Sequence, residues 1–173
     1  MTTKPGRRRG ERGASLIEFA MIAPLLFILL FGVIEFARLV GSYTSVWTAA
    51  REGARYATTS GEDTVNPSIL RYKSCDGILA AAQAKIVMTE VTAANIEISW
   101  VAEDGTVLAD CDSSTAPIDP ATDHNLILPT GTQIQVRVTD AFNGVVPIVG
   151  GMLDGIDLSS TQKRSIYLGV LGD

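Results

Sequence analysis

Apolar side chains dominate residues 14–37, and only Glu18 and Glu35 interrupt them. The sixteen residues 19–34 carry no charge. A helix needs roughly 20 predominantly apolar residues to cross the hydrocarbon core of a bilayer, so this pattern predicts a transmembrane helix. A carboxylate such as that of Glu18 costs about 2.5–3.5 kcal/mol to place in lipid on insertion scales, so we expect it to have a partner or a function.

Helical spacing continues beyond the apolar run and predicts one nearly continuous helix over residues 14–58, about 65 Å long at 1.5 Å per residue. The polar residues 60–63, followed by Pro67, predict its end. Pro24 lies inside the apolar run, where it removes one backbone hydrogen bond and favours a kink. We therefore expect the first half of this helix to lie in lipid and the second half to rise from it.

Small side chains recur every four residues along the second half of this helix. They are Ala37, Gly41, Ser45, Ala49, Gly53 and Ala57. Such a row permits the close approach of another helix, although alanine-rich helices also produce it by chance. We expect the row to contact a neighbouring subunit, so that Gly53→Leu would leave the monomer folded and disrupt assembly.

The remaining residues, 59–173, are long enough to bury a small core of their own. Their patterning predicts a helix at residues 76–91 with Asp76 as its N-cap, strands at residues 95–102, 107–109, 133–139 and 161–170, and a packed loop or short helix at residues 145–153. One helix and a small antiparallel sheet behind a long N-terminal helix define an α+β fold.

Residues 1–13 form a basic leader with five cationic side chains against one anionic, Glu11. This asymmetry predicts a single-pass protein of the cytoplasmic membrane, with its N-terminus in the cytoplasm and its C-terminal part outside. The expected organisation is a leader at residues 1–13, a transmembrane and extended helix at residues 14–58, and an extracytoplasmic globular domain at residues 59–173.

Charge excludes one class of partner. The chain has 14 basic and 19 acidic side chains, and without the leader nine basic side chains face eighteen acidic ones. Nucleic-acid binding calls for basic patches, so we expect no nucleic-acid partner.

Two cysteines, Cys75 and Cys111, fall in the part expected outside the cytoplasm, where an even count suggests one disulfide. Two free buried thiols are the alternative. Acidic residues and the single histidine gather between residues 110 and 124: Asp110, Asp112, Asp119, Asp123 and His124. They lack calcium-loop and zinc-ligand spacing, and the chain has no recognisable catalytic motif. We expect no metal site, no cofactor and no enzymatic activity.

Three features of the N-terminal segment resemble one family. Gly13 closes the basic leader, and Glu18 is the fifth residue after it. The apolar run contains E-F-A-x-x-x-P, which is Glu18, Phe19, Ala20 and Pro24. The block A-R-E-G-A-R ends at Arg55 and comprises Ala50, Arg51, Glu52, Gly53, Ala54 and Arg55. Over about its first 60 residues the chain resembles the TadE-like family, the minor pilins or pseudopilins of the tight-adherence (Tad/Flp, type IVb) machinery.

The resemblance implies cleavage between Gly13 and Ala14 by a prepilin peptidase, and a small pilin-like domain behind the helix. It implies a structural role in assembling Flp-type pili for adherence or related export, with other pilins and the membrane components of the system as partners. The spacing suggests that Glu18 pairs with the new amino terminus at Ala14 of a neighbouring subunit. Whether the protein enters the fibre, primes it or tips it is left open.

The sequence also leaves two other classes of function open. One is an uncleaved single-pass membrane protein whose outer domain binds a ligand or scaffold. The other is an extracytoplasmic enzyme whose acidic residues converge only in the folded chain.

Overall fold

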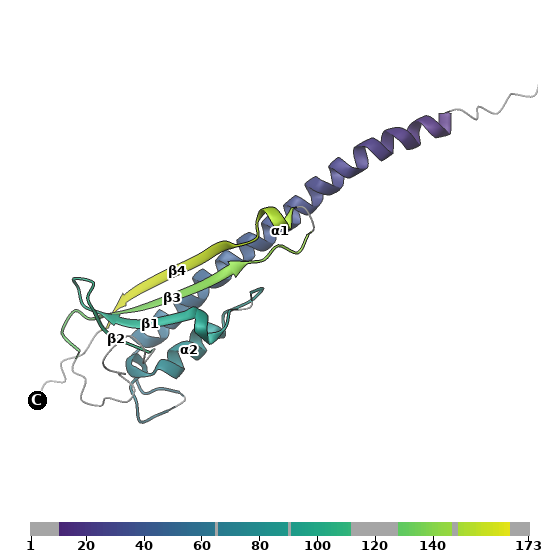
Figure 1. The fold of residues 1–173 in the computed structure, drawn as a ribbon. Coiled ribbons are helices and arrows are strands. Elements are labelled where there is room, and N and C mark those ends of the chain that lie inside the picture. Colours follow the sequence, from purple (N-terminus) through teal and green to yellow (C-terminus); the bar gives the residue numbers. More distant parts are fainter. Residues whose placement is uncertain (1–10, 65, 90, 112–127, 147–148, 167–173) are drawn as a thin grey trace, which may run out of the picture.

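The computed structural model describes residues 11–64, 66–89, 91–111, 128–146 and 149–166. Its main elements are α1 (Glu11–Thr58), α2 (Cys75–Gln83), β1 (Ile96–Val101), β2 (Val107–Asp110), β3 (Gln133–Phe142) and β4 (Ile156–Ser165). Three short 3₁₀ helices join them, η1 (Arg71–Lys73), η2 (Ala93–Asn95) and η3 (Gly150–Met152). The strands form one antiparallel sheet in the order β2-β1-β3-β4 (Figure 1). The predicted α+β fold is confirmed.

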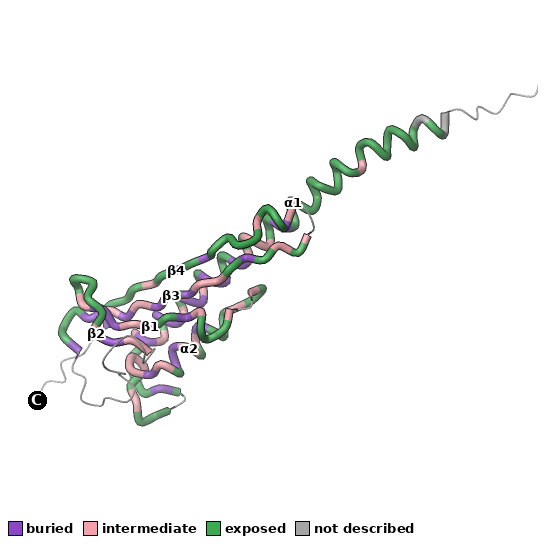
Figure 2. The backbone as a smooth tube through the Cα atoms, viewed as in Figure 1, coloured by how far each residue is buried: buried purple, intermediate pink, exposed green. Residues whose placement is uncertain are grey.

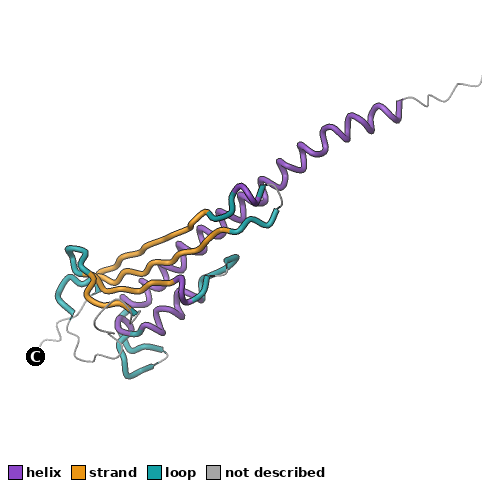
Figure 3. Tube along the Cα trace, viewed as in Figure 1, coloured by secondary structure: helices purple, strands orange, loops and turns teal. Residues whose placement is uncertain are grey.

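The long helix α1 has two different surroundings. Its N-terminal half projects away from the rest of the chain, and its C-terminal half lies along the sheet and α2 (Figures 1 and 3). It continues through Pro24 without a break and ends at Thr58, the predicted end. It begins at Glu11 rather than at residue 14, so its first turn includes the end of the predicted leader.

The core lies between α1, α2 and the inner face of the sheet. Figure 2 shows buried residues concentrated in this lower half of the molecule and exposed residues along the projecting part of α1. β1 and β3 alternate in burial, as expected for strands with one covered face. The largest fully buried apolar side chains are those of Val46, Ile78, Trp100, Ile134, Val136 and Val138.

The row of small residues packs inside the monomer, which corrects the predicted contact with a neighbour. Ala49, Gly53 and Ala57 are buried. A Cβ atom on Gly53 would lie 3.2 Å from the Cβ of Ala82 in α2 and 3.3 Å from Cγ1 of Val136 in β3. The small side chains therefore let α2 and the sheet approach α1 closely. Only Ala37, at the N-terminal end of the row, is exposed.

The second helix is shorter than predicted, and its N-cap is a different residue. The Ser74 hydroxyl accepts a hydrogen bond from the Gly77 backbone N–H, whereas Asp76 lies in the first turn and is exposed. The helix ends at Gln83, and the chain turns back towards α1, where the Val87 N–H donates to Ser45 Oγ at 2.8 Å. This contact spans 42 residues of sequence, so local periodicity could not reveal it.

The strands confirm the predicted hairpin and correct two boundaries. β1 and β2 match the predicted strands around the turn at residues 103–106. β3 extends beyond residue 139 to Phe142, and β4 covers residues 156–165 instead of 161–170. The two pair over ten residues each, from Gln133 with Ser165 to Phe142 with Ile156. Cross-strand pairing therefore extends both strands towards the connection at residues 143–155, and residues 167–170 lie outside the described chain.

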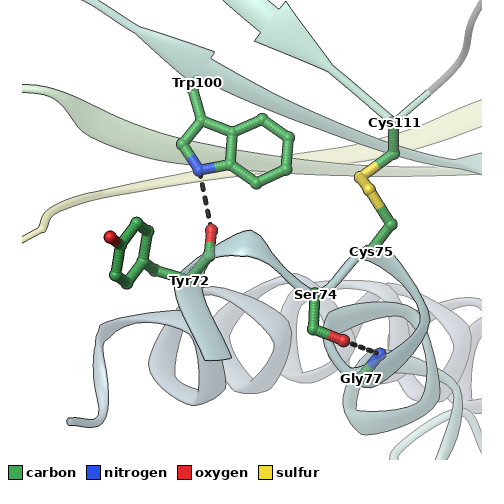
Figure 4. The surroundings of a disulfide bond; sticks show 6 residues. All are labelled: Tyr72, Ser74, Cys75, Gly77, Trp100 and Cys111. Carbon is green, nitrogen blue, oxygen red and sulfur yellow. Dashed lines mark hydrogen bonds between the residues drawn. A yellow bond between two sulfur atoms is a disulfide. The ribbon is translucent and has the colours of Figure 1, made fainter. Parts of the chain in front are cut away.

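The predicted disulfide joins Cys75 to Cys111, with their Cα atoms 5.7 Å apart. It links the first residue of α2 to the end of β2 (Figure 4). Nearby, Trp100 Nε1 donates to the Tyr72 carbonyl oxygen at 2.9 Å. The bond closes a loop with a sequence separation of 36, which corresponds to about 3.5–4 kcal/mol in the chain-entropy description.

The contacts of Gly53 generate a stability prediction. Gly53→Leu should destabilise the folded domain by about 3 kcal/mol, since its side chain overfills the space between Ala82 and Val136. Urea unfolding of the full chain in detergent, followed by the fluorescence of buried Trp100, measures the change. Ala37→Leu is the matched control in the same row and should leave the unfolding midpoint unchanged. Equal midpoints for both variants would contradict the packing described.

Candidate interaction surface on the long helix

The projecting half of α1 exposes large apolar side chains on every side. Those between residues 16 and 34 are 40–77% exposed. A soluble monomer rarely exposes a continuous apolar surface of this extent. The segment is long and apolar enough to cross a membrane, and it lies near the N-terminus. This part of α1 therefore requires a surrounding of lipid or of other apolar helices.

Exposed apolar side chains continue along one stripe beyond that segment. We call Phe36, Val40, Tyr43 and Trp47 the outer seam; they are 39–63% exposed. Their spacing of four, three and four residues keeps them on one side of the helix. The same alternation continues back through the exposed residues Val33, Leu29, Leu26 and Ile22. A repeat of this kind is the pattern that packs one helix along another in a left-handed supercoil.

Lipid alone does not account for the outer seam. A helix rises 1.5 Å per residue, so the 19 steps from Leu16 to Glu35 cover about 28 Å, close to the thickness of the hydrocarbon core. Trp47 lies twelve steps further, about 18 Å along the axis. The headgroup region on each side of a bilayer adds only about 5–8 Å, so Trp47 lies beyond it in an upright helix.

Glu35 sits where the apolar segment meets the globular part, and its side chain is completely buried. Its Oε1 atom accepts hydrogen bonds from the Val145 backbone N–H at 2.9 Å and from Arg38 Nη1 at 3.0 Å. Arg38 also lies over the ring of Phe142, 5.5 Å from its centroid. Oε2 is buried and has no hydrogen-bond partner among the described residues. Glu35 thus attaches the connection between β3 and β4 to α1 at the end of the apolar segment.

In the sequence, Glu35 stands out only as an interruption of the apolar run. Its main partner, Val145, lies 110 residues away. The available signal was a carboxylate at the end of a membrane-length segment, where it requires compensation.

The block A-R-E-G-A-R has two faces. Gly53 and Ala54 are buried against the rest of the domain. Arg51 is exposed and lies over the ring of Trp47, 5.2 Å from its centroid, so it extends the end of the outer seam. Arg55 pairs with Glu52 at 2.6 Å, and its hydrogen bonds lower the pKa of the Glu52 carboxyl group. The block therefore combines packing inside the monomer with an exposed cationic edge.

The other predicted site residues on α1 are exposed. Gly13, Glu18, Phe19 and Pro24 all lie on its projecting part. The main chain at Ala14 is helical and continuous with Gly13. Among the described residues, nothing within 4 Å would meet a Cβ atom on Gly13.

Among the described residues, no group of three histidine, cysteine, aspartate or glutamate side chains is placed so that it could hold a metal ion. Of the predicted cluster, Asp112, Asp119, Asp123 and His124 lie outside the described residues. Asp110 ends β2.

Residues 13–55 match the model of the family described as TadE-like protein. No curated protein and no solved structure matches the chain. The matched segment contains Gly13, the E-F-A-x-x-x-P motif and A-R-E-G-A-R, and it lies entirely on α1. The resemblance to the TadE-like family is confirmed over this helix, and it is consistent with the Tad pilus system.

The contacts of Glu35 generate a second prediction. In Glu35→Ala the Val145 N–H loses a charged acceptor, so its hydrogen-exchange protection should fall by about tenfold or more. Glu35→Gln keeps an oxygen acceptor and should lose less. The amide of Cys111, bonded to the Ile98 carbonyl oxygen, is an internal control in the same samples. Unchanged exchange of Val145 in Glu35→Ala would show that Glu35 does not hold the connection.

Proposed function

We propose that this chain is a minor pilin or pseudopilin-like structural protein that helps to assemble Tad/Flp-type (type IVb) pili for adherence or related export. The observation that carries the proposal is that the matched segment 13–55 lies on one helix, and that the exposed apolar seam of this helix continues past the lipid to Tyr43 and Trp47. A partner protein with an apolar helix of its own would cover both the apolar segment at residues 16–34 and the outer seam. The proposed role is not enzymatic.

The proposed topology places residues 1–13 in the cytoplasm, since the basic leader resists translocation. A prepilin peptidase cuts after Gly13. The mature helix from Ala14 to Thr58 then anchors the protein in the cytoplasmic membrane, and residues 59–173 form the extracytoplasmic domain. An oxidising compartment on that side suits the disulfide between Cys75 and Cys111.

Glu18 is proposed to fix the axial register between neighbouring subunits during assembly. Cleavage creates a cation at the amino group of Ala14, near the membrane face. Glu18 of one subunit pairs with that amino group on a neighbour, because two opposite charges attract strongly in a medium of low dielectric constant and each alone is penalised there. The exposed position of Glu18 on α1 leaves it accessible to such a neighbour.

The outer seam is the proposed contact with a partner helix above the membrane. Its 4-3-4 spacing matches the geometry in which helices cross at about 20° and interlock along a left-handed seam. Tyr43 and Trp47 supply large rigid contact surfaces, and Arg51 over Trp47 gives the end of the seam a positive charge. The proposed partners are other pilins and the membrane assembly components of the system.

Processing provides the first test. Expressed with its cognate prepilin peptidase, the chain should yield a mature protein that begins at Ala14, and Gly13→Val should abolish the cut. Intact mass and N-terminal sequencing measure both results. An intact leader, under conditions where a control prepilin is cleaved, would instead favour an uncleaved single-pass membrane protein with a binding domain.

The outer seam provides the second test. Tyr43→Asp should reduce co-purification with the cognate pilin by about tenfold or more, because a charge replaces a large apolar contact. Thr44→Asp is the matched control, an exposed position one residue along the same helix but off the seam. Both variants should keep the urea midpoint of the parent chain. Equal co-purification of the two variants would exclude the seam as the contact.

A further inference from the structure

The connection between β3 and β4, residues 143–155, is the part of the globular domain that reaches furthest along α1 towards the projecting helix (Figure 1). The hydrogen bond from the Val145 N–H to Glu35 fixes its height on that helix. If Leu16 lies at one edge of the hydrocarbon core, Glu35 lies about 28 Å away, at the other edge. The connection therefore sits level with the bilayer surface.

The composition of this connection suits that position. The thirteen residues 141–153, between Asp140 and Asp154, carry no charged side chain. Two large apolar side chains on it are among the most exposed in the described chain, Val145 at 71% and Met152 at 82%. Pro147 and Ile148 lie outside the described residues. Exposed apolar groups at this height would otherwise face water in an acidic domain.

Several backbone groups in the described part of the connection are already hydrogen-bonded, as a segment needs before it enters an apolar environment. Gly144 N–H donates to Asp154 Oδ1 at 2.6 Å, and Gly155 N–H donates to the Phe142 carbonyl oxygen at 3.1 Å. Within it, Gly150 N–H donates to the Val146 carbonyl oxygen at 2.7 Å. The main chains of Gly144 and Gly150 are in such close contact that a Cβ atom on either would collide. The described residues of the connection therefore form a compact, preformed tip.

We propose that this tip is a second membrane contact: Val145 and Met152 dip into the interface of the lipid bilayer beside the transmembrane helix. Lipid is the occupant that the height favours, since the tip is continuous with the surface of α1 where the apolar segment ends. The charged groups mark the boundary, with Asp154 closing the base of the tip and Glu35 buried behind it. Two attached points, the helix and the tip, fix the tilt of the domain on the membrane.

This inference rests on the membrane span of the proposed function and not on its role in pilus assembly. Single cysteines placed in the full chain, reconstituted in vesicles of phosphatidylcholine and phosphatidylglycerol, can carry a nitroxide spin label. The native cysteines are paired with each other and do not compete. The informative position is Met152→Cys. Leu26→Cys reports the span, and Thr106→Cys, in the turn between β1 and β2, reports the aqueous part of the domain.

Collision with apolar oxygen, compared with a polar nickel complex, measures the environment of each label. The ratio at Met152 should be several-fold higher than at Thr106 and lower than at Leu26. A ratio at Met152 equal to that at Thr106, with Leu26 still in lipid, would overturn the membrane contact and leave the span intact. A ratio at Leu26 equal to that at Thr106 would overturn both the contact and the transmembrane part of the proposed function.

The variant Met152→Asp provides an independent measurement, because an aspartate resists insertion into the interface. It should lower the oxygen-to-nickel ratio at a label on Gly151→Cys, whereas Thr106→Asp should not. Both substitutions are on exposed positions and leave the core untouched. An unchanged ratio at Gly151 in Met152→Asp would contradict the proposal.

Discussion

The close packing of the sheet and α2 against α1 is the contact on which the rest of the molecule depends. It exists because the covered face of α1 is made mostly of small side chains, with Ala49, Ala50 and Ala54 completely buried and Val46 the larger exception. A Cβ atom on Gly53 would lie only 3.2 Å from the Cβ atom of Ala82. At this separation, one added carbon atom already forces the neighbouring atoms to move. Protein interiors are packed too densely to accommodate several added carbon atoms. The small residues therefore decide where the domain can sit on the helix.

This arrangement distributes side-chain size on α1 in an unusual way. An amphipathic helix of a soluble domain normally buries its large apolar residues and exposes polar ones. Here the buried face carries mainly Ser45, Ala49 and Gly53, whereas Tyr43 and Trp47 are exposed. The monomer thus satisfies only one side of the helix. The apolar side chains on the exposed side are removed from water only when a partner covers them. The outer seam therefore supports a role in assembly.

Local sequence patterns were sufficient for some features and insufficient for others, for identifiable reasons. The end of α1 at Thr58 and the alternation in β1 depend on neighbouring residues, and both were predictable. The length of α2 was not, because the bond from Val87 to Ser45 joins distant segments. The sequence does not reveal the role of Gly53, because a small residue leaves equal room for the chain's own sheet and for a helix of another subunit. The junction at Glu35 depends on Val145, which lies too far along the chain for any local signal.

Glu35 joins the projecting half of α1 to the globular part of the chain. It determines where the connection between β3 and β4 lies on the helix and does not add to the free energy of unfolding. A buried carboxylate loses its hydration, and an ion pair with a half-exposed arginine recovers little of that free energy. Its unpartnered Oε2 adds a further desolvation cost. A less costly apolar residue at this site could pack, but it could not accept the Val145 N–H and would leave that donor unsatisfied. The carboxylate therefore selects one register of the tip on the helix, and that register sets the height of the domain above the apolar segment.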